Sequence, residues 1–382
     1  LAKHAELAEH ELNAILDNKK TTDLLRGFKR PDENRHINDD IEPEVIDAML
    51  EAVEKRFDLA KKFYRLKAKA LDLKKFKYYE RGLPVGELND NYPYPEATKL
   101  VKKAFGELDQ KFLNIFDQFL ASGQIDVLPK KGRSGGAFCA HDLITLPTYI
   151  LLNHTGKLRD VLTLAHELGH GINNELIREK QPAIYFGTPM CTAEVASTFM
   201  EDFVLEELGK NTTDKSRFAL QMAKLQDDVS SIFRQVACYR FEQALHCAFR
   251  KEGYLSYKRI GELFQKEMRS YLGPVFTYNK GEQNWWVYWS HIRSFFYVYS
   301  YASGLLISKS MQAMVREDKN NIDKVKEFLS AGTSNSPKNI FKKMGIDITN
   351  PKFWDKGLKE IEALLIDTER LYKRIDKKTL RA

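Results

Sequence analysis

Of all features of this 382-residue chain, the motif His166-Glu167-Leu168-Gly169-His170 limits its possible folds most strongly. Its two histidines lie side by side only if the motif is helical. Residues four apart lie on one face of a helix, one turn apart, so both imidazoles can reach one metal ion. Zinc accepts nitrogen ligands at about 2.0–2.1 Å. The carboxylate of Glu167 follows the first histidine directly, where it can contact a water molecule on the metal and serve as general base.

A motif of this kind also arises by chance in roughly one or two of a hundred such chains, as two histidines without a role on an amphipathic helix. Its neighbours argue against that alternative. Residues 161–165 are mostly apolar, so the helix is predicted to be buried, where two histidines and a glutamate without partners would be costly. Gly169 and Gly171 each weaken the helix by about 1 kcal/mol relative to alanine, unless another group approaches the backbone closely. The motif therefore predicts one Zn²⁺ per chain.

A third metal ligand is expected from a second helix. Glu175 and Glu179 follow on the helix of the motif and cannot curl back onto the metal. A further helix is predicted to begin near Thr192, with Glu194 in its first turn among apolar residues, and an antiparallel return would bring Glu194 over the histidines. Two histidines and one glutamate leave a fourth position for water, which is typical of a catalytic site. Glu201, on the same face, either orients a ligand from behind or is a partly exposed carboxylate.

The rest of the chain is dominated by helical periodicity, over residues 1–30, 42–80 and 96–122 and from about residue 157 almost to the end. The stretch 123–156 differs, because β-branched and aromatic clusters alternate there with glycine and proline. Short strands are predicted at Ile125–Leu128, Ala137–Ala140 and Tyr149–Asn153. The chain is thus predicted to be mainly α, with one small β-sheet beside the helix of the motif.

Composition excludes several classes of protein. Lys and Arg number 60 against 53 Asp and Glu, and the basic stretches at residues 71–79 and at the C-terminus are best explained as solvated helix faces. A nucleic-acid partner is therefore not predicted. No apolar run approaches the roughly 20 residues that span a bilayer, so no membrane partner is predicted either. Four cysteines without a CxxC pair favour reduced thiols and a cytoplasmic protein.

Five segments together resemble the M3 family of zinc metallopeptidases, in particular its oligoendopeptidase F branch, and the resemblance covers essentially the whole chain. They are GRSGGAF at 132–138, PTYILLNHTGKLRDVLTLAHELGHGIN at 147–173, TAEVASTFMEDFVLEEL at 192–208, RQVACYRFEQALH at 234–246 and HIRSFFYVYSYASG at 291–304. The resemblance implies a zincin-like helical metallopeptidase fold, with a helical region at 1–123 flanking the cleft and a catalytic region at 124–382. Full-length members carry a further N-terminal helical lobe, so the chain, which begins without methionine, is expected to be a fragment.

The resemblance also assigns roles to individual residues. It makes His166, His170 and Glu194 the zinc ligands and Glu167 the general base. It further implies that His291 and tyrosines downstream of it bind the substrate and stabilise the tetrahedral intermediate.

Helix geometry helps to choose among these tyrosines. Tyr297 and Tyr301 are four apart on one helical face, whereas Tyr299 points away. Tyr301 is the first choice and Tyr297 the second. The alternative is that these aromatic side chains only fill the core, and for Tyr299 this alternative is preferred.

The glycine pair Gly135-Gly136, with Ala137, needs a separate explanation. Without side chains at Gly135 and Gly136, another backbone could approach and pair with the edge of the strand. The resemblance implies a substrate-binding edge strand here, beside the zinc helix. The alternative is a glycine hairpin turn.

These features predict a zinc endopeptidase that cuts short, unstructured oligopeptides, with no indication of its cleavage-site preference or oligomeric state. One alternative is a zinc carboxypeptidase of related helical design, which would need a basic group for the C-terminal carboxylate of its substrate, and the sequence offers no clear candidate. Another is a non-catalytic peptide-binding protein, which would have no need of Glu167 as a base. Cobalt or manganese would accept the same ligands as zinc.

Overall fold

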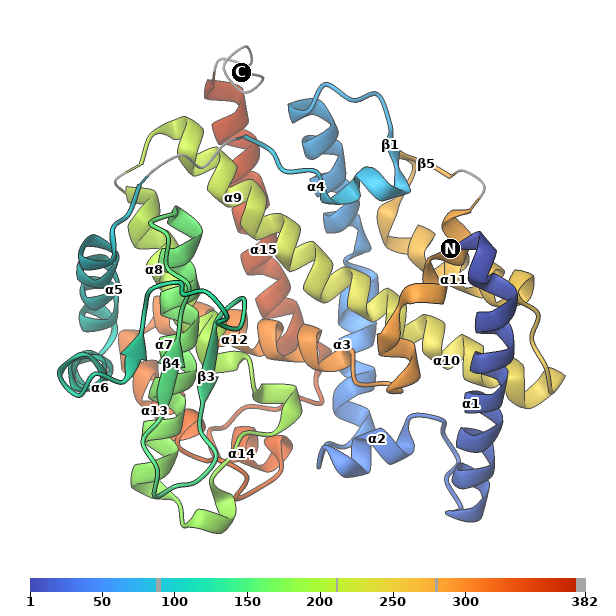
Figure 1. Ribbon diagram of the computed structural model, residues 1–382, viewed down its shortest axis with the longest axis horizontal. Coiled ribbons are helices and arrows are strands. Elements are labelled where there is room, and N and C mark those ends of the chain that lie inside the picture. Colours follow the sequence, from blue (N-terminus) through green and yellow to red (C-terminus); the bar gives the residue numbers. More distant parts are fainter. Residues whose placement is uncertain (87–90, 211, 279–280, 376–382) are drawn as a thin grey trace. The chain divides into compact units, whose positions relative to one another are not determined.

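A computed structural model describes residues 1–86, 91–210, 212–278 and 281–375 of the chain (Figure 1). The chain forms two compact units, each assembled from segments that are distant in the sequence. Unit 1 consists of Leu1–Val85, Met222–Ser303 and Ile348–Ala382, and unit 2 consists of Gly86–Gln221 and Gly304–Asp347. The regions expected from the sequence, 1–123 and 124–382, follow the order of the chain instead, and the roles assigned to them remain predictions.

Unit 2 is built around helix α7, the helix of the histidine motif. Its helices are α5 (Tyr94–Leu108), α6 (Gln110–Ala121), α7 (Leu158–Lys180), α8 (Val195–Lys210), α13 (Ile322–Leu329) and α14 (Pro337–Lys343), with parts of α9 (Asp214–Asp228) and α12 (Tyr299–Glu317). The carboxylate of Asp160 accepts the backbone N–H of Thr155 and Lys157 and so caps the start of α7. One face of α7 is fully buried through Val161, Leu164, Leu168 and Ile172.

Three short strands form the predicted sheet, and two of them pack against α7. They are β2 (Ile125–Asp126), β3 (Phe138–Ala140) and β4 (Tyr149–Leu151), in the order β2–β4–β3. Strand β4 lies in the middle, parallel to β2 and antiparallel to β3. Each strand overlaps its predicted segment and is one or two residues shorter. Both β3 and β4 contact α7, as Figure 1 also shows.

Among its described residues, unit 1 has helices and one pair of two-residue strands. Its helices are α1 (Ala5–Leu25), α2 (Glu33–Asn38), α3 (Pro43–Lys55), α4 (Phe57–Ala70), α10 (Arg234–Glu252), α11 (Tyr257–Leu272) and α15 (Pro351–Arg374), with the remaining parts of α9 and α12. Strands β1 (Phe76–Lys77) and β5 (Phe276–Thr277) pair in parallel. The rings of Phe76 and Phe276 stack at 5.4 Å between centroids, and Tyr64 meets Phe276 edge-on at 4.9 Å. The sequence did not predict this pair, because two residues are too few to produce a strand pattern.

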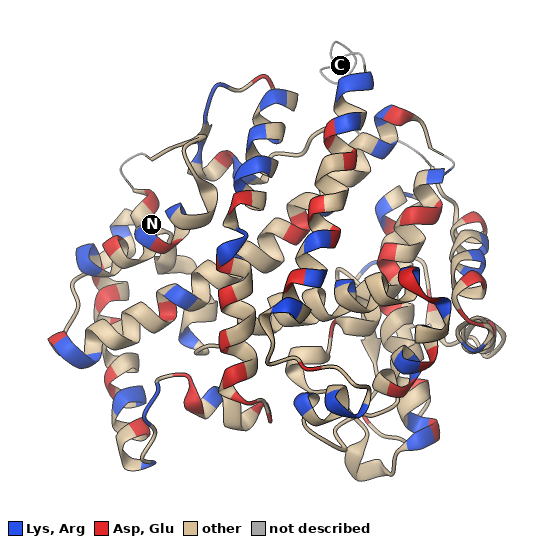
Figure 2. Cartoon of the chain, turned by 180° about the vertical axis from the view of Figure 1, so that it is seen from behind, with Lys and Arg blue, Asp and Glu red and all other residues tan. Residues whose placement is uncertain are grey.

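The prediction of a mainly α chain with a small β-sheet beside the helix of the motif is confirmed, and the β1–β5 pair is a second sheet that was not predicted. Figure 2 shows Lys and Arg interleaved with Asp and Glu along most helices. Many of these charges pair one turn apart, such as Lys62 with Asp58 on α4 and Lys326 with Asp323 on α13. Among the described helices, none is both long and apolar enough to cross a lipid bilayer.

Candidate active site

Helix α7 and the segment that leads into α8 bring the three predicted metal ligands together. The Nε2 atoms of His166 and His170 lie 3.3 Å and 3.5 Å from Oε2 of Glu194. The ligand atoms of the three residues all lie within 4.8 Å of one another, and no other such cluster of His, Cys, Asp or Glu occurs in the described part of the chain. Two imidazole nitrogens and one carboxylate oxygen are the protein ligands of many catalytic zinc sites, so the donor set fits the metal.

The close approach of α7 and α8 depends on Gly169. A Cβ atom at this position would lie 2.5 Å from Cα of Ser197 and 2.7 Å from the carbonyl oxygen of Ala196, which is closer than real side chains allow. At Gly171, a Cβ atom would lie 3.0 Å from the ring of Phe119. The sequence indicated a close neighbour at Gly169 and at Gly171, and these contacts identify both neighbours.

Glu194 lies one residue before the start of α8, rather than inside the first turn. Its carbonyl oxygen accepts the N–H of Thr198 at 3.2 Å, so it caps the helix. Its carboxylate accepts the hydroxyl of Ser197 at 2.8 Å while it faces the two histidines. The side chain is 45% exposed, as a site open to a substrate requires. Sequence reasoning missed Ser197, although its position three residues after a helix cap was the available signal.

Glu201 lies behind His166. Its Oε2 atom is 3.2 Å from Nδ1 of His166, and its side chain is only 20% exposed. A carboxylate on the second ring nitrogen fixes the orientation of a metal-binding histidine and raises its basicity. Of the two alternatives for Glu201, the geometry fits the residue that orients a ligand.

Burial and hydrogen bonding shift the pKa values of His166 and Glu194 in opposite directions. Burial alone would lower the pKa of His166, but its hydrogen bonds to Glu194 and Glu201 outweigh burial and raise that pKa to about 10. Burial would raise the pKa of Glu194, yet the bonds from His166 and His170 lower it instead. A divalent cation competes with the proton for these ligand atoms. Glu167 is 7% exposed, and burial raises the pKa of its carboxyl group.

The predicted substrate strand lies in the same unit. Gly135 and Gly136 form a bend just before β3, and a Cβ atom at either position would meet nothing within 4 Å. The side-chain amide of Asn153 donates to the carbonyl oxygens of Ser134 and Gly136, at 3.0 Å and 2.7 Å. Because β3 pairs with β4 and not with β2, this bend is not the turn of a hairpin. Among the described strands β3 is an edge strand, and the role of residues 135–137 in substrate binding remains a prediction.

The residues predicted to contact the substrate from the C-terminal half cluster in unit 1. The ring of His291 stacks on Tyr297 and Tyr301, with centroids 5.2 Å and 5.9 Å apart. The hydroxyl of Tyr301 lies 3.5 Å from Nε2 of His291, at the outer limit of a hydrogen bond. Tyr297 lies in a turn before α12 and still joins the cluster. Tyr299, by contrast, is fully buried and donates to Asp39 at 2.8 Å, as expected of a core residue.

A strained turn brings Tyr297 back over His291. Phe295 and Phe296 have φ angles of 50° and 58°, a left-handed conformation that is unusual for bulky residues and costs about 1–3 kcal/mol each. The carboxyl group of Glu242 accepts the N–H of Phe296 at 2.6 Å, and the ring of His246 contacts both phenylalanine rings. Burial raises the pKa of Glu242 to about 8. Sequence reasoning missed Glu242, whose signal is its four-residue spacing from His246 on α10.

The two clusters belong to different units. His166, His170 and Glu194 are in unit 2, whereas His291, with the two tyrosines, is in unit 1. Their joint action in catalysis remains a prediction.

Two curated bacterial peptidases are similar to this chain over most of its length. "Oligopeptidase PepF" from Bacillus subtilis (strain 168) is 28% identical to the chain over 356 residues, which are 91% of this chain and 53% of that protein. "Oligoendopeptidase F, chromosomal" from Lactococcus lactis subsp. cremoris is 29% identical over 357 residues, which are 91% of this chain and 58% of that protein. The chain therefore spans a little over half the length of these curated relatives.

A solved structure matches the fold closely. The crystal structure of a candidate peptidase from Chlamydophila abortus superimposes with a TM-score of 0.90 and 23% identity, over 97% of this chain and 62% of that one. Because the sequence identity is only 23%, this match shows a similar fold and nothing further. The sequence pattern described as Peptidase family M3 matches residues 2–360. Because that match runs through both units and almost the whole length, the chain belongs to peptidase family M3.

Proposed function

We propose that this protein is a zinc-dependent endopeptidase that hydrolyses short, unstructured oligopeptides. The observation that carries the proposal is the convergence of His166, His170 and Glu194, whose ligand atoms lie within 4.8 Å of one another in a member of family M3. Because the chain spans little more than half of its relatives, the activity named in those relatives is part of the proposal.

The residues of the chain divide the work of peptide hydrolysis. When bound, zinc would polarise the carbonyl of the scissile bond and lower the pKa of a water molecule. His166, His170 and Glu194 would hold the ion, and Glu201 keeps the ring of His166 in orientation. Glu167 accepts the proton of the attacking water and then returns it to the leaving amine. Its burial favours this role, since a raised pKa lets a carboxylate keep a proton briefly near neutral pH.

His291 and Tyr301 are the proposed donors to the oxyanion that forms during attack. Their support is the stacked arrangement with Tyr297, in which the hydroxyl of Tyr301 points to the ring of His291. The open backbone at Gly135 and Gly136 is proposed to pair with the substrate in extended form. A cytoplasmic setting is part of the proposal and rests on four free cysteines.

The test combines metal analysis with a quenched-fluorescence peptide assay. The purified protein should contain about one zinc per chain. Glu167→Gln should keep the metal and bind peptide but lose turnover, because it removes only the base. Glu179→Gln is the matched control on the same helix, since Glu179 lies at the surface and pairs with Lys111. Turnover that survives in Glu167→Gln would refute the mechanism, and binding without turnover in the unmodified protein would favour a peptide-binding protein.

Peptides with blocked C-termini separate the endopeptidase from the carboxypeptidase. An endopeptidase cuts a peptide internally whether its C-terminus is free or amidated. A carboxypeptidase releases the last residue and cuts only the free form. Mass spectrometry of the products distinguishes the two results.

A further inference from the structure

A cavity of about 160 Å³ in unit 1 lies next to His291. Cavities of about 150 Å³ can hold a benzene ring. Phe264 and Tyr78, both buried, and the indoles of Trp285 and Trp289 contribute aromatic walls, and Tyr288, which is 59% exposed, lies on the side open to solvent. The size and lining of the cavity therefore suit one aromatic side chain.

Two arginines give the cavity a positive charge. The guanidinium of Arg81 lies 4.2 Å from the ring centre of Tyr78 and 4.8 Å from that of Trp285, and it donates to the carbonyl oxygen of Tyr78 at 2.8 Å. The guanidinium of Arg234 lies 5.9 Å from the ring centre of Trp289. Both side chains are half-buried. The aromatic rings thus hold the two guanidinium groups in place without neutralising them.

Neither guanidinium forms an ion pair with a carboxylate in the described part of the chain, and the buried Nε of Arg234 has no hydrogen-bond partner there. Removing a charge from water without a counter-ion is costly, so such a charge is expected to meet an anion from outside. Guanidinium binds carboxylates through two parallel hydrogen bonds.

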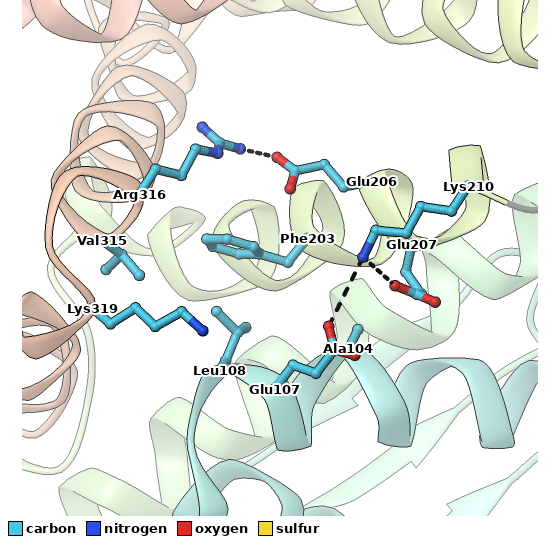
Figure 3. Close-up of a pocket in the computed structure, with 10 residues that line it drawn as sticks. All are labelled: Ala104, Glu107, Leu108, Phe203, Glu206, Glu207, Lys210, Val315, Arg316 and Lys319. Atoms are coloured by element: carbon cyan, nitrogen blue, oxygen red, sulfur yellow. Dashed lines mark hydrogen bonds and ion pairs between the residues drawn. The ribbon is translucent and has the colours of Figure 1, made fainter.

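A cavity in unit 2 provides the contrast (Figure 3). It has about 320 Å³ and also contains basic side chains. There, however, Arg316 pairs with Glu206, and Lys210 pairs with Glu207 and lies 3.9 Å from Glu107. Arg316 and Lys210 thus have carboxylate partners in the protein, and Lys319, the third basic side chain of that cavity, is exposed to solvent. Arg81 and Arg234 differ from all three, because they are half-buried and have no carboxylate partner among the described residues.

The backbone at Arg234 is also unusual. Arg234 is the first residue of α10, directly after a π-helical turn at Val229–Phe233. Such turns are rare and occur frequently at functional sites. The same cavity is lined by His291, which the proposed function assigns to the substrate.

We infer that this cavity binds the C-terminal residue of a peptide, with an aromatic side chain between the indoles and the α-carboxylate on Arg234 and Arg81. The inference rests on the proposed peptidase function and deepens it, because it names the free C-terminus of a peptide as the group that this cavity recognises. It also supplies the basic group that the sequence did not reveal, since Arg81 and Arg234 lie far apart in the chain.

The first test measures turnover with matched peptides that end in phenylalanine as the free acid or as the amide. Amidation should raise KM about 10- to 100-fold with little change in kcat, as expected when a charge-assisted hydrogen bond made in substrate and transition state alike is lost. Arg234→Gln should raise KM for the free acid to the value for the amide, and Arg234→Lys should restore part of the difference. Arg26→Gln, at an exposed arginine after α1 with no ion pair among the described residues, is the matched control. Equal KM values for acid and amide would overturn the inference.

The second test does not depend on catalysis. N-acetyl-phenylalanine and its amide are titrated into the whole protein while its tryptophan fluorescence, to which Trp285 and Trp289 contribute, is followed. Saturable quenching by the acid alone, lost in Arg234→Gln and in Arg81→Gln but kept in Arg26→Gln, is expected. Equal response to acid and amide, or quenching by the acid that persists in both folded cavity variants, would refute the site. If no peptide is hydrolysed at all, the proposed function fails, while this titration still decides on the cavity.

Discussion

The His166 cluster of unit 2 and the His291 cluster of unit 1 are built in opposite ways. Both ring nitrogens of His166 face carboxylates, Glu194 on one side and Glu201 on the other. The ring of His291 lies between aromatic rings instead, and its buried Nδ1 has no hydrogen-bond partner among the described residues. The first arrangement offers three ligand atoms that suit a resident cation. In the second, polar atoms remain available, as the proposed role in binding the reacting peptide requires.

The largest effect is expected from breaking the first cluster. Glu194→Ala removes one of the three proposed zinc ligands, so zinc content should fall well below one per chain and peptide turnover should drop by more than about 10³-fold. Metal analysis and the peptide assay measure the two effects. Ser197→Ala is the graded companion, since it removes only the hydroxyl that orients Glu194. If Glu194→Ala keeps its zinc, the assignment of the third ligand is wrong.

Substitutions in the second cluster should lower turnover without any loss of metal. Tyr301→Phe removes one hydroxyl and should lower kcat by about 10²–10³-fold, the typical cost of losing an oxyanion donor. Zinc content should stay unchanged. Tyr297→Phe tests the second choice for the same role, because both rings stack on His291. If only Tyr297→Phe impairs turnover, the two tyrosines exchange roles, and if neither does, the cluster has no part in catalysis.

Glu201→Gln should weaken the first cluster without breaking it. An uncharged amide accepts the hydrogen bond from Nδ1–H of His166 less strongly than a carboxylate does, and loss of such a carboxylate typically reduces metal affinity about 10–100-fold. Competition with a chelator measures the affinity directly. An unchanged affinity would make Glu201 a carboxylate that merely lies near the ring.

The difference between the clusters also explains what could be predicted from the sequence. His166 and His170 are four apart, so local spacing was enough to predict two of the ligands. The third, Glu194, followed from the expected antiparallel return of the next helix, and the structure brings all three together. Gly169 indicated a close neighbour, and the structure shows that this neighbour is α8. The His291 cluster depends on contacts between distant segments. The bond from Phe296 to Glu242 joins two such segments, and no local pattern reveals the strained turn that it holds.

Because Glu242 accepts a hydrogen bond from the strained turn, we expect the stability of the fold to depend on pH. The pKa of Glu242 is about 8 in the folded protein, above its ordinary value of 4.5, because burial disfavours the charged form. The folded state therefore binds more protons than the unfolded state between these values, and stability should fall as pH rises from 4.5 to 8, by at most about 1.4 kcal/mol per pH unit. Glu242→Gln keeps a carbonyl acceptor for Phe296 and should flatten this part of the profile. Denaturant unfolding at several pH values measures both slopes, and equal slopes would contradict the prediction.

The smallest effect on turnover is expected at Tyr299. This residue lies between Tyr297 and Tyr301 in the sequence but is not a candidate for catalysis. From the sequence alone, Tyr299→Phe should be nearly silent. The structure changes that expectation for stability, because the buried hydroxyl donates to Asp39, and removal of a donor to a buried carboxylate costs about 1–3 kcal/mol. Turnover per folded molecule should stay near that of the unmodified protein, whereas the midpoint of urea unfolding should fall. Tyr301→Phe should give the reverse pattern, with normal stability and low turnover. If each of the two variants loses both stability and turnover, Tyr299 and Tyr301 do not have separate roles. The aromatic cluster around His291 would then be part of the core rather than of the site.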